Sequence, residues 1–259
     1  AVAEPGGAVF VQTPVYGPFL SVAQHAGMAR EEMELTRLPD GTYAVDAQRM
    51  AAAMTDRCRA FLLCNPHNPV GRVYRRDELE AMADVCLARG AIIVSDEIHC
   101  DFVYDGRRHT PIATLAPEVE ARTVTLLAPS KTFNVAGLCC SVAVIPDQAL
   151  RRAFTDARRG LVPEVNVLGY VAALAAYRDA QAEVDDRRQG RVLGGPAFGL
   201  LDLVFGDADP ARSVDVRLQA QSAALLSLDR DGDALTGFSA ELGPLHRSTQ
   251  LQVAAQHGR

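Results

Sequence analysis

The sequence predicts an α/β fold built on a mostly parallel sheet, and three observations carry this prediction. Up to about residue 180, short apolar runs alternate with helical segments, which is typical of βαβ units. The apolar runs are rich in β-branched residues and nearly continuous, as expected of strands buried on both faces. A chain of 259 residues with 48% hydrophobic and 22% charged residues can also bury one large core or two smaller ones.

Five apolar runs are the candidate strands of this sheet. They are Ala8–Gln12, Ala60–Cys64, Ala91–Ser95, Thr123–Leu127 and Ser141–Ile145. Each is short, as strands are, and turn-forming or polar residues flank most of them.

Two helices have clear sequence signals. The segment from about Arg76 to Arg89 carries one apolar stripe, and Gly90 follows where a left-handed cap is expected; the stripe consists of Leu79, Met82, Ala83, Cys86 and Leu87. A second helix is expected from Pro146 or Asp147 to about Arg159, with Asp147 as N-cap and arginines at the negative end of the helix dipole.

The pattern changes after about Ala180. A polar run covers 185–191, Leu200–Phe205 fits a strand or part of a helix, and Leu218–Leu228 fits a helix. We therefore expect one domain over residues 1–180 and assign no fold to residues 181–259.

Composition excludes several functions. The net charge of −6, with no basic run, argues against nucleic-acid binding, and no apolar stretch is long enough to span a bilayer. The six cysteines lack metal-site or disulfide spacing, which favours reduced thiols in a cytoplasmic protein and no bound metal. The run Asp229–Asp233 resembles the start of a calcium loop, but Ala234 and Ala240 occupy the positions that need glycine and glutamate.

Lys131 is the only lysine of the chain, although Lys and Arg together number 26. Arginine stays protonated and cannot form an imine, whereas a lysine amine can attack a carbonyl. A lone lysine on a solvated loop is the simpler interpretation, so its neighbours decide between the two.

Polar residues follow four of the predicted strands. Tyr16 lies just after the first strand, Asn68 after the second, Asp96 and His99 after the third, and Ser130 and Lys131 after the fourth. In an open α/β sheet, ligands bind beyond the carboxyl ends of the strands. Alone, the run 65–71 is typical of a turn, and Asp96 with Glu97 fits a helix cap or a metal ligand.

Lysine, carboxylate, amide and aromatic ring are together the groups that pyridoxal phosphate requires. The motifs that carry the likeness are Val11–Tyr16, Leu63–Val73, Val94–Asp101 and Pro129–Leu138. With them, residues 1–180 resemble the large domain of fold-type I pyridoxal-phosphate enzymes of the class I/II aminotransferase superfamily. At position 99 the chain has a histidine where aminotransferases usually carry tyrosine. In this feature it resembles the MalY/PatB branch of cystathionine β-lyases.

The resemblance implies a role for each site residue. Lys131 forms the Schiff base and removes the substrate Cα proton, Asp96 pairs with the pyridine nitrogen, Asn68 binds the ring oxygen, and Tyr16 stacks on the ring. His99 lies beside the ring oxygen. Ser130 contacts the phosphate or caps its own turn. The implied reaction is β-elimination from a cysteine S-conjugate such as L-cystathionine, by a homodimer, with pyruvate, ammonia and a thiol as products.

Departures from the family pattern leave two alternatives open. Ala128 stands where the family has a phosphate-binding serine, the glycine-containing phosphate helix belongs before Ala1, and no context for the carboxylate-binding arginine follows Ala180. These departures predict a chain without the family's N-terminal part and recognisable small domain. Transamination by the same residues, or a non-catalytic remnant, are the alternatives to lyase activity.

Overall fold

The computed structural model describes residues 1–104, 106–180, 184–185, 216–217 and 225–226. Its main sheet has the strand order β2-β1-β5-β6-β7-β8. The strands are β1 (Ala8–Thr13), β2 (Ala29–Glu34), β5 (Cys58–Cys64), β6 (Ile92–Asp96), β7 (Thr123–Leu127) and β8 (Val142–Val144). All neighbouring pairs are parallel except β7 and β8, which are antiparallel. The mostly parallel sheet and all five predicted strands are confirmed.

β2 is a strand that the sequence does not indicate. Its sequence, Ala-Arg-Glu-Glu-Met-Glu, is mostly charged, and Met33 is its only buried residue. It pairs with β1 alone and forms one edge of the sheet, where charged side chains reach solvent and discourage pairing with another chain.

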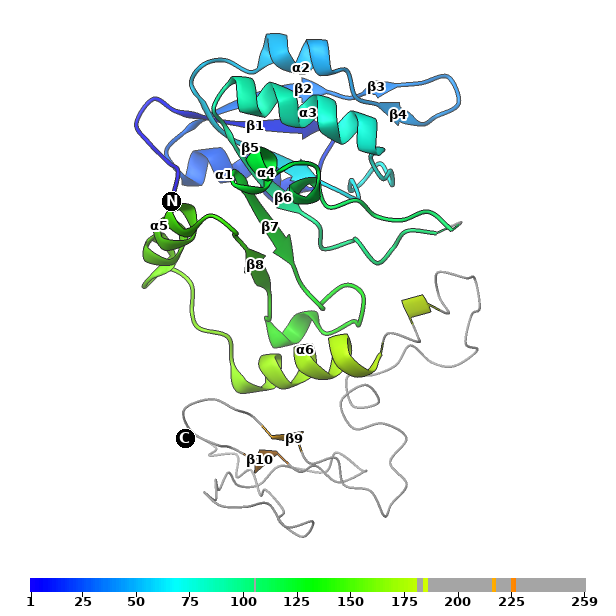
Figure 1. Ribbon diagram of the computed structural model, residues 1–259, viewed down its shortest axis with the longest axis vertical. Coiled ribbons are helices and arrows are strands. Elements are labelled where there is room, and N and C mark those ends of the chain that lie inside the picture. The colour runs from blue at the N-terminus through cyan, green and yellow to red at the C-terminus, as the bar shows by residue number, and fades with distance from the viewer. Residues whose placement is uncertain (105, 181–183, 186–215, 218–224, 227–259) are drawn as a thin grey trace, which may run out of the picture.

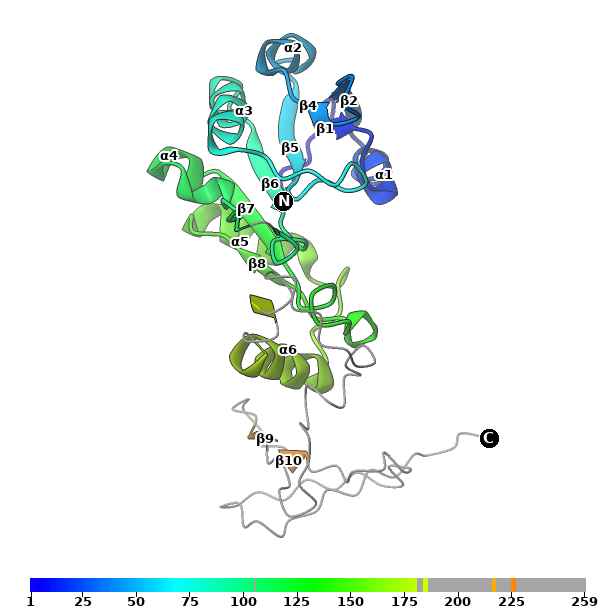
Figure 2. The same cartoon turned by 90° about the vertical axis from the view of Figure 1, so that its right-hand side faces the viewer.

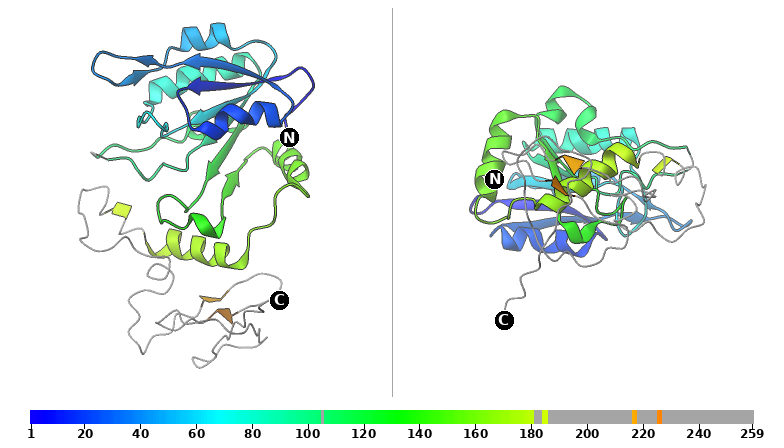
Figure 3. Two further views of the ribbon diagram at one scale, coloured as in Figure 1. Left: turned by 180° about the vertical axis from the view of Figure 1, so that it is seen from behind. Right: turned by 90° about the horizontal axis from the view of Figure 1, so that it is seen from below.

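Helices cover both faces of the sheet (Figures 1 and 2). α1 (Gly17–His25) lies on one face and is best seen from behind in Figure 3. α2 (Ala47–Ala53), α3 (Arg76–Ala88) and α4 (Pro117–Glu120) lie on the other. A short hairpin of β3 (Thr36–Arg37) and β4 (Tyr43–Ala44) follows β2, and the turn η1 (Ile112–Thr114) precedes α4.

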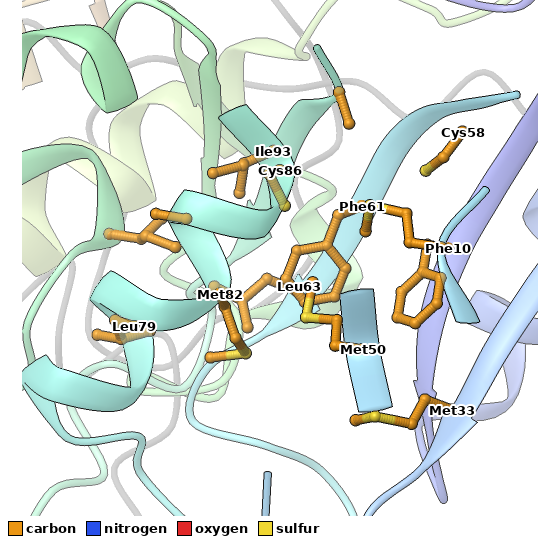
Figure 4. Packing of buried hydrophobic residues seen from close by; sticks show 14 of the residues in the cluster. Phe10, Met33, Met50, Cys58, Phe61, Leu63, Leu79, Met82, Cys86 and Ile93 are labelled. Carbon is orange, nitrogen blue, oxygen red and sulfur yellow. The ribbon is translucent and has the colours of Figure 1, made fainter. Parts of the chain in front are cut away.

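The strands bury side chains on alternate faces, as their period of two requires. Phe10, Phe61 and Leu63 face the larger cluster, which Met50 of α2 and Met82 of α3 complete (Figure 4). Val11 and Cys64 face the opposite cluster with Phe19 of α1. The central strands β1 and β5 are therefore covered on both sides, which explains why they read as continuous apolar runs, whereas β8 at the edge exposes Val142 and Val144.

Both predicted helices are confirmed, with their caps. α3 ends next to Gly90, which has φ +64° as a left-handed cap requires. α5 (Gln148–Arg158) has Asp147 as N-cap, with its carboxylate accepting the Leu150 N–H at 2.7 Å.

α6 (Val167–Asp179) packs on the chain that follows β7. Ala176 and Ala180 bury Phe133 and Val135, and α6 also contacts the turn η2 (Ala136–Leu138). Asn166 caps α6 by accepting the Gly169 N–H at 2.9 Å, and its amide donates to the Leu138 carbonyl at 2.8 Å. α6 thus supports the segment that carries Lys131.

Little of the chain beyond Ala180 is described. The expected element at 200–205 lies outside the described residues, as does most of the helix expected over 218–228. Leu225 and Leu226, which are described, form the strand β10 (Leu225–Leu226), paired antiparallel with β9 (Val216–Arg217). The expectation of a helix is therefore wrong at these two residues, whose backbone is extended. None of the described helices is long and apolar enough to cross a membrane.

Candidate active site

Three neighbouring parallel strands end side by side and fix the centre of the candidate site. In the register of the sheet, Asp96 pairs with Cys64 on one side and with Leu126 on the other. Beyond the strand ends, the Asn65 N–H donates to the Asp96 carbonyl at 3.0 Å, and the Glu97 N–H donates to the Leu126 carbonyl at 3.0 Å. The segments after β5, β6 and β7 therefore leave the sheet from one edge.

Asp96 is the last residue of β6 and its carboxyl group is largely shielded from solvent. Burial raises its pKa, while the Ile98 N–H, which donates to Oδ1 at 3.1 Å, and the nearby His99 act in the opposite direction. Among the described residues, no Lys or Arg forms an ion pair with Asp96. A buried carboxylate without a cationic partner is suited to binding a cationic group of a ligand.

Lys131 lies four residues beyond β7, in a turn closed by backbone hydrogen bonds. The Phe133 N–H donates to the Pro129 carbonyl at 3.0 Å, and the Val135 N–H donates to the Ser130 carbonyl at 3.1 Å. The Lys131 side chain is exposed and forms no ion pair within the part of the chain that the structure covers. The Ser130 hydroxyl likewise forms no hydrogen bond there, so backbone groups alone close the turn.

Asn68 and Tyr16 follow the two other parallel strands of this edge. Asn68 is half-buried, and its N–H donates to the Cys64 sulfur at 3.4 Å, which turns the chain back over the end of β5. Tyr16 precedes α1 at its N-cap position and leaves 50% of its surface exposed. Its ring is therefore available for contact with a ligand.

His99 lies three residues after Asp96 and is half-buried. The Phe102 N–H donates to the His99 carbonyl at 2.9 Å, and the two rings are 6.0 Å apart. The structure thus places all six predicted site residues in the segments beyond the carboxyl ends of β1, β5, β6 and β7.

A buried polar chain links two of these segments. Tyr74, with only 2% of its surface exposed, places its hydroxyl 3.0 Å from both Gln12 Oε1 and His67 Nδ1. His67 Nε2 lies 2.9 Å from the Pro14 carbonyl. Since a carbonyl only accepts, Nε2 carries the proton, and burial lowers the pKa of His67, which favours the neutral ring. This chain connects the segment with Asn68 to the segment with Tyr16.

A second buried pair lies beneath the loop after β6. Glu97 is only 1% exposed, and its carboxylate accepts the Ser95 hydroxyl at 2.8 Å and faces His109 Nε2 at 2.7 Å. A metal site at Glu97, His99, Asp101 and His109 is one arrangement that the sequence allows. No group of three metal-ligating side chains occurs among the residues that the structure places.

Sequence patterns did not single out Gln12, Tyr74 or Thr132 as parts of this edge. Gln12 and Thr132 stand within the motifs but carry no distinguishing spacing. Tyr74 follows the motif by one residue, and only its burial and its two polar contacts connect it to the site.

The open, mostly parallel sheet with polar residues beyond its strand ends defines an α/β protein with a ligand site at that edge. The model of the family "Aminotransferase class I and II" matches residues 1–191. The chain therefore belongs to this family, a family of enzymes whose cofactor is pyridoxal phosphate.

Individual relatives include both lyases and aminotransferases. Cystathionine beta-lyase PatB of Bacillus subtilis is 39% identical over 188 residues, which cover 72% of this chain and 48% of the relative. An aspartate aminotransferase of Geobacillus stearothermophilus is 32% identical over 186 residues, covering 72% and 47%. Cystalysin from Treponema denticola, whose crystal structure contains pyridoxal 5'-phosphate, superposes with a TM-score of 0.68 at 34% identity, covering 71% and 47%. The chain thus spans about half the length of these relatives.

The residues present fit the ring of pyridoxal phosphate. Asp96 offers a shielded carboxylate with no Lys or Arg partner among the described residues, and the Lys131 amine is exposed and so accessible to an aldehyde. The fit to the phosphate is weaker. Ala128 has no hydroxyl group to donate, so Ser130 offers the only hydroxyl in the run Ala128–Ser130 that precedes Lys131.

Proposed function

We propose that this chain carries the catalytic residues of a pyridoxal-phosphate-dependent carbon–sulfur β-lyase. Its substrates are L-cystathionine or other cysteine S-conjugates, and its products are pyruvate, ammonia and a thiol. The proposal depends chiefly on one observation. The shielded Asp96 carboxylate, which forms no ion pair with a Lys or Arg among the described residues, lies on the strand next to the one that leads to Lys131. The likeness to PatB and the histidine at position 99 favour lyase over transaminase chemistry.

The same proposal assigns the domain boundaries. Residues 1–180 form part of the cofactor-binding domain, and residues 181–259 remain without an assigned fold. The family match over residues 1–191 supports the first assignment.

Lys131 and Asp96 have the central roles. Bound pyridoxal phosphate supplies an electron sink for the electron pair left at the substrate Cα. The Lys131 amine holds the cofactor aldehyde before substrate arrives and afterwards accepts the Cα proton. The Asp96 carboxylate, which is poorly solvated because it is largely shielded, would be stabilised by a protonated ring nitrogen and would in turn hold the proton on that nitrogen. The electron pair at Cα would then form a Cα=Cβ double bond as the Cβ–sulfur bond breaks, and the sulfur would leave with its electron pair and take up a proton to give the thiol. The released 2-aminoacrylate would react with one water to give pyruvate and ammonia.

The remaining residues orient the cofactor. The Asn68 amide donates to the ring oxygen, and the half-exposed Tyr16 ring stacks on the pyridine face. His99 lies beside the ring oxygen, and Ser130 offers its hydroxyl to the phosphate. Support for these roles comes from their placement in the four segments of one sheet edge.

Transamination is the second candidate, and the likeness to an aspartate aminotransferase supports it. The same Lys131 amine would accept the Cα proton. The product, however, would be a 2-oxo acid that keeps its β-substituent, instead of pyruvate and a free thiol.

Borohydride trapping tests the proposal directly. The purified chain is mixed with pyridoxal phosphate and reduced, and peptides are then mapped by mass spectrometry. Because Lys131 is the only lysine of the sequence, a phosphopyridoxyl-lysine peptide can come from this residue alone. We expect a phosphopyridoxyl group on Lys131, and none in a Lys131→Arg variant, which keeps the charge but cannot form an imine.

Product analysis then separates the candidate reactions. Pyruvate and thiol released from cystathionine identify the lyase, whereas an intact 2-oxo acid identifies the transaminase. An unmodified Lys131 contradicts the proposal and supports a non-catalytic remnant of the family.

We infer in addition that the chain is cytoplasmic and that it forms a homodimer. All six cysteines are free, which supports a reducing compartment. The family resemblance alone supports the homodimer, which sedimentation velocity of the purified chain tests.

A further inference from the structure

A side-chain hydrogen bond joins the loop after β6 to the turn after β7. The Thr132 hydroxyl donates to Asp101 Oδ2 at 2.9 Å. Thr132 follows Lys131 directly, and Asp101 lies two residues after His99. The bond therefore connects the segment that carries Lys131 with the segment that carries Asp96 and His99.

Both partners of this bond are held in place by their own segments. Thr132 is only 4% exposed, and the neighbouring Phe133 is buried against α6. On the other side, the Cys100 N–H donates to the Glu97 carbonyl at 2.9 Å, and the Phe102 N–H donates to the His99 carbonyl at 2.9 Å. A hydrogen bond between two tightly turned segments fixes their separation better than one between mobile side chains.

We propose that Asp101 and Thr132 are a positioning pair for the reaction. Their hydrogen bond holds the Lys131 turn at a fixed separation from the segment that contains Asp96 and His99. This inference rests on the proposed function, because it assigns the pair the task of aligning the Lys131 amine with the cofactor ring that Asp96 holds. Neither residue touches the reacting atoms.

Such a pair is useful because the sheet pairing between β6 and β7 ends before it reaches Lys131. The register between β6 and β7 fixes their backbones only as far as Asp96 and Leu126, and Lys131 lies five residues beyond Leu126. The hydrogen bond between Thr132 and Asp101 adds a contact next to Lys131 itself, and this contact limits rotations of the turn that would move the amine away from its target. Misplacement of a reacting group by about 1 Å can reduce a rate about a hundredfold.

Three variants with a matched control test the proposal. Thr132→Val removes the hydroxyl at nearly constant volume, Thr132→Ser keeps it, and Asp101→Asn keeps an oxygen that can accept it. Thr123→Val is the control, because the Thr123 hydroxyl is also buried but donates to the Val119 carbonyl, at the opposite end of β7.

Two measurements are made on the full chain. Hydrogen exchange of the cofactor-free protein reports on peptides that contain residues 97–103 and 130–135. We expect faster exchange in both peptides for Thr132→Val, and unchanged exchange for Thr132→Ser. Titration with pyridoxal phosphate should give about tenfold to hundredfold weaker binding for Thr132→Val, as expected if the full contribution of one hydrogen bond to a charged group is lost. Thr123→Val should bind like the unsubstituted chain.

The outcomes separate the pair from the proposed function. If Thr132→Val exchanges and binds cofactor as Thr123→Val does, the positioning role is wrong, whatever the chain catalyses. If the unsubstituted chain traps no cofactor, the proposed function fails, while hydrogen exchange still decides whether the pair couples the two segments. Should Thr132→Val not fold, Asp101→Asn and Thr132→Ser must both retain cofactor binding within about twofold, and a larger loss in either contradicts the inference.

Discussion

Removal of the Tyr74 hydroxyl should measure how strongly the buried polar chain holds the site together. Tyr74→Phe keeps the ring, which packs edge-on against His67 at 5.8 Å and beneath the Arg72 guanidinium at 4.7 Å. Only the hydroxyl is lost, so the substitution isolates its hydrogen bonds to Gln12 and His67.

The expected cost follows from what the hydroxyl leaves behind. Gln12 is 1% exposed and His67 is 2% exposed, so water cannot replace the lost partner without rearrangement. An unsatisfied buried polar group costs about 1–3 kcal/mol. The single O–H hydrogen serves one of the two acceptors at a time, so we expect Tyr74→Phe to lower the free energy of unfolding by about 2 kcal/mol.

Urea denaturation followed by far-UV circular dichroism measures this change, since the chain has no tryptophan for fluorescence. Tyr170→Phe is the control, because Tyr170 is 54% exposed and its loss should stay within about 0.5 kcal/mol. A Tyr74→Phe protein as stable as the Tyr170→Phe control would refute the role assigned to the polar chain.

Three further predictions concern charge and capping. Burial raises the pKa of Asp96, so ionisation of this carboxyl group at pH 7 lowers the free energy of unfolding. Asp96→Asn should therefore raise the melting temperature of the cofactor-free chain at pH 7, while it weakens cofactor binding. Burial lowers the pKa of His67, so as the pH falls the imidazole is protonated in the unfolded chain before it is protonated in the folded chain. The free energy of unfolding should therefore fall as the pH drops below about 6.5. His67→Gln should make the free energy of unfolding less dependent on pH in urea titrations. Asp147→Ala removes the cap of α5 and should cost about 1 kcal/mol in the same assay, whereas Asp147→Asn should cost less.

The central sheet could be predicted because its strands are buried on both faces. Continuous apolar runs such as Phe61 to Cys64 have no other place in a folded chain of this size, and their ends mark the edge where ligand residues gather. The apolar stripe of α3 and the left-handed cap at Gly90 could also be predicted, since each depends on the local geometry of a helix.

Other elements could not be predicted, for different physical reasons. β2 is rich in glutamate because an edge strand tolerates charge, so its sequence lacks the apolar run of a strand. α6 is apolar on nearly all its faces, so no stripe distinguishes it from a buried strand.

The side-chain contacts that join the site segments could not be predicted from the sequence either. Thr132 with Asp101, and Tyr74 with Gln12, are separated by 31 and 62 residues, and no local pattern encodes such pairs. The sequence indicates which residues gather at the sheet edge, but the side chains that hold their segments together become visible only in three dimensions.

The reversed direction of β8 has a consequence for how Lys131 can move. β7 and β8 pair antiparallel from Thr125 with Val144 to Leu127 with Val142, so the chain between them leaves the sheet and returns to the adjacent strand. Residues 128–141 therefore form an arch, and its two ends are held together by the backbone hydrogen bonds between β7 and β8. A lysine that must alternately bind and release a partner can then do so by rotating its own four-carbon side chain, without separation of the two strands that carry the arch.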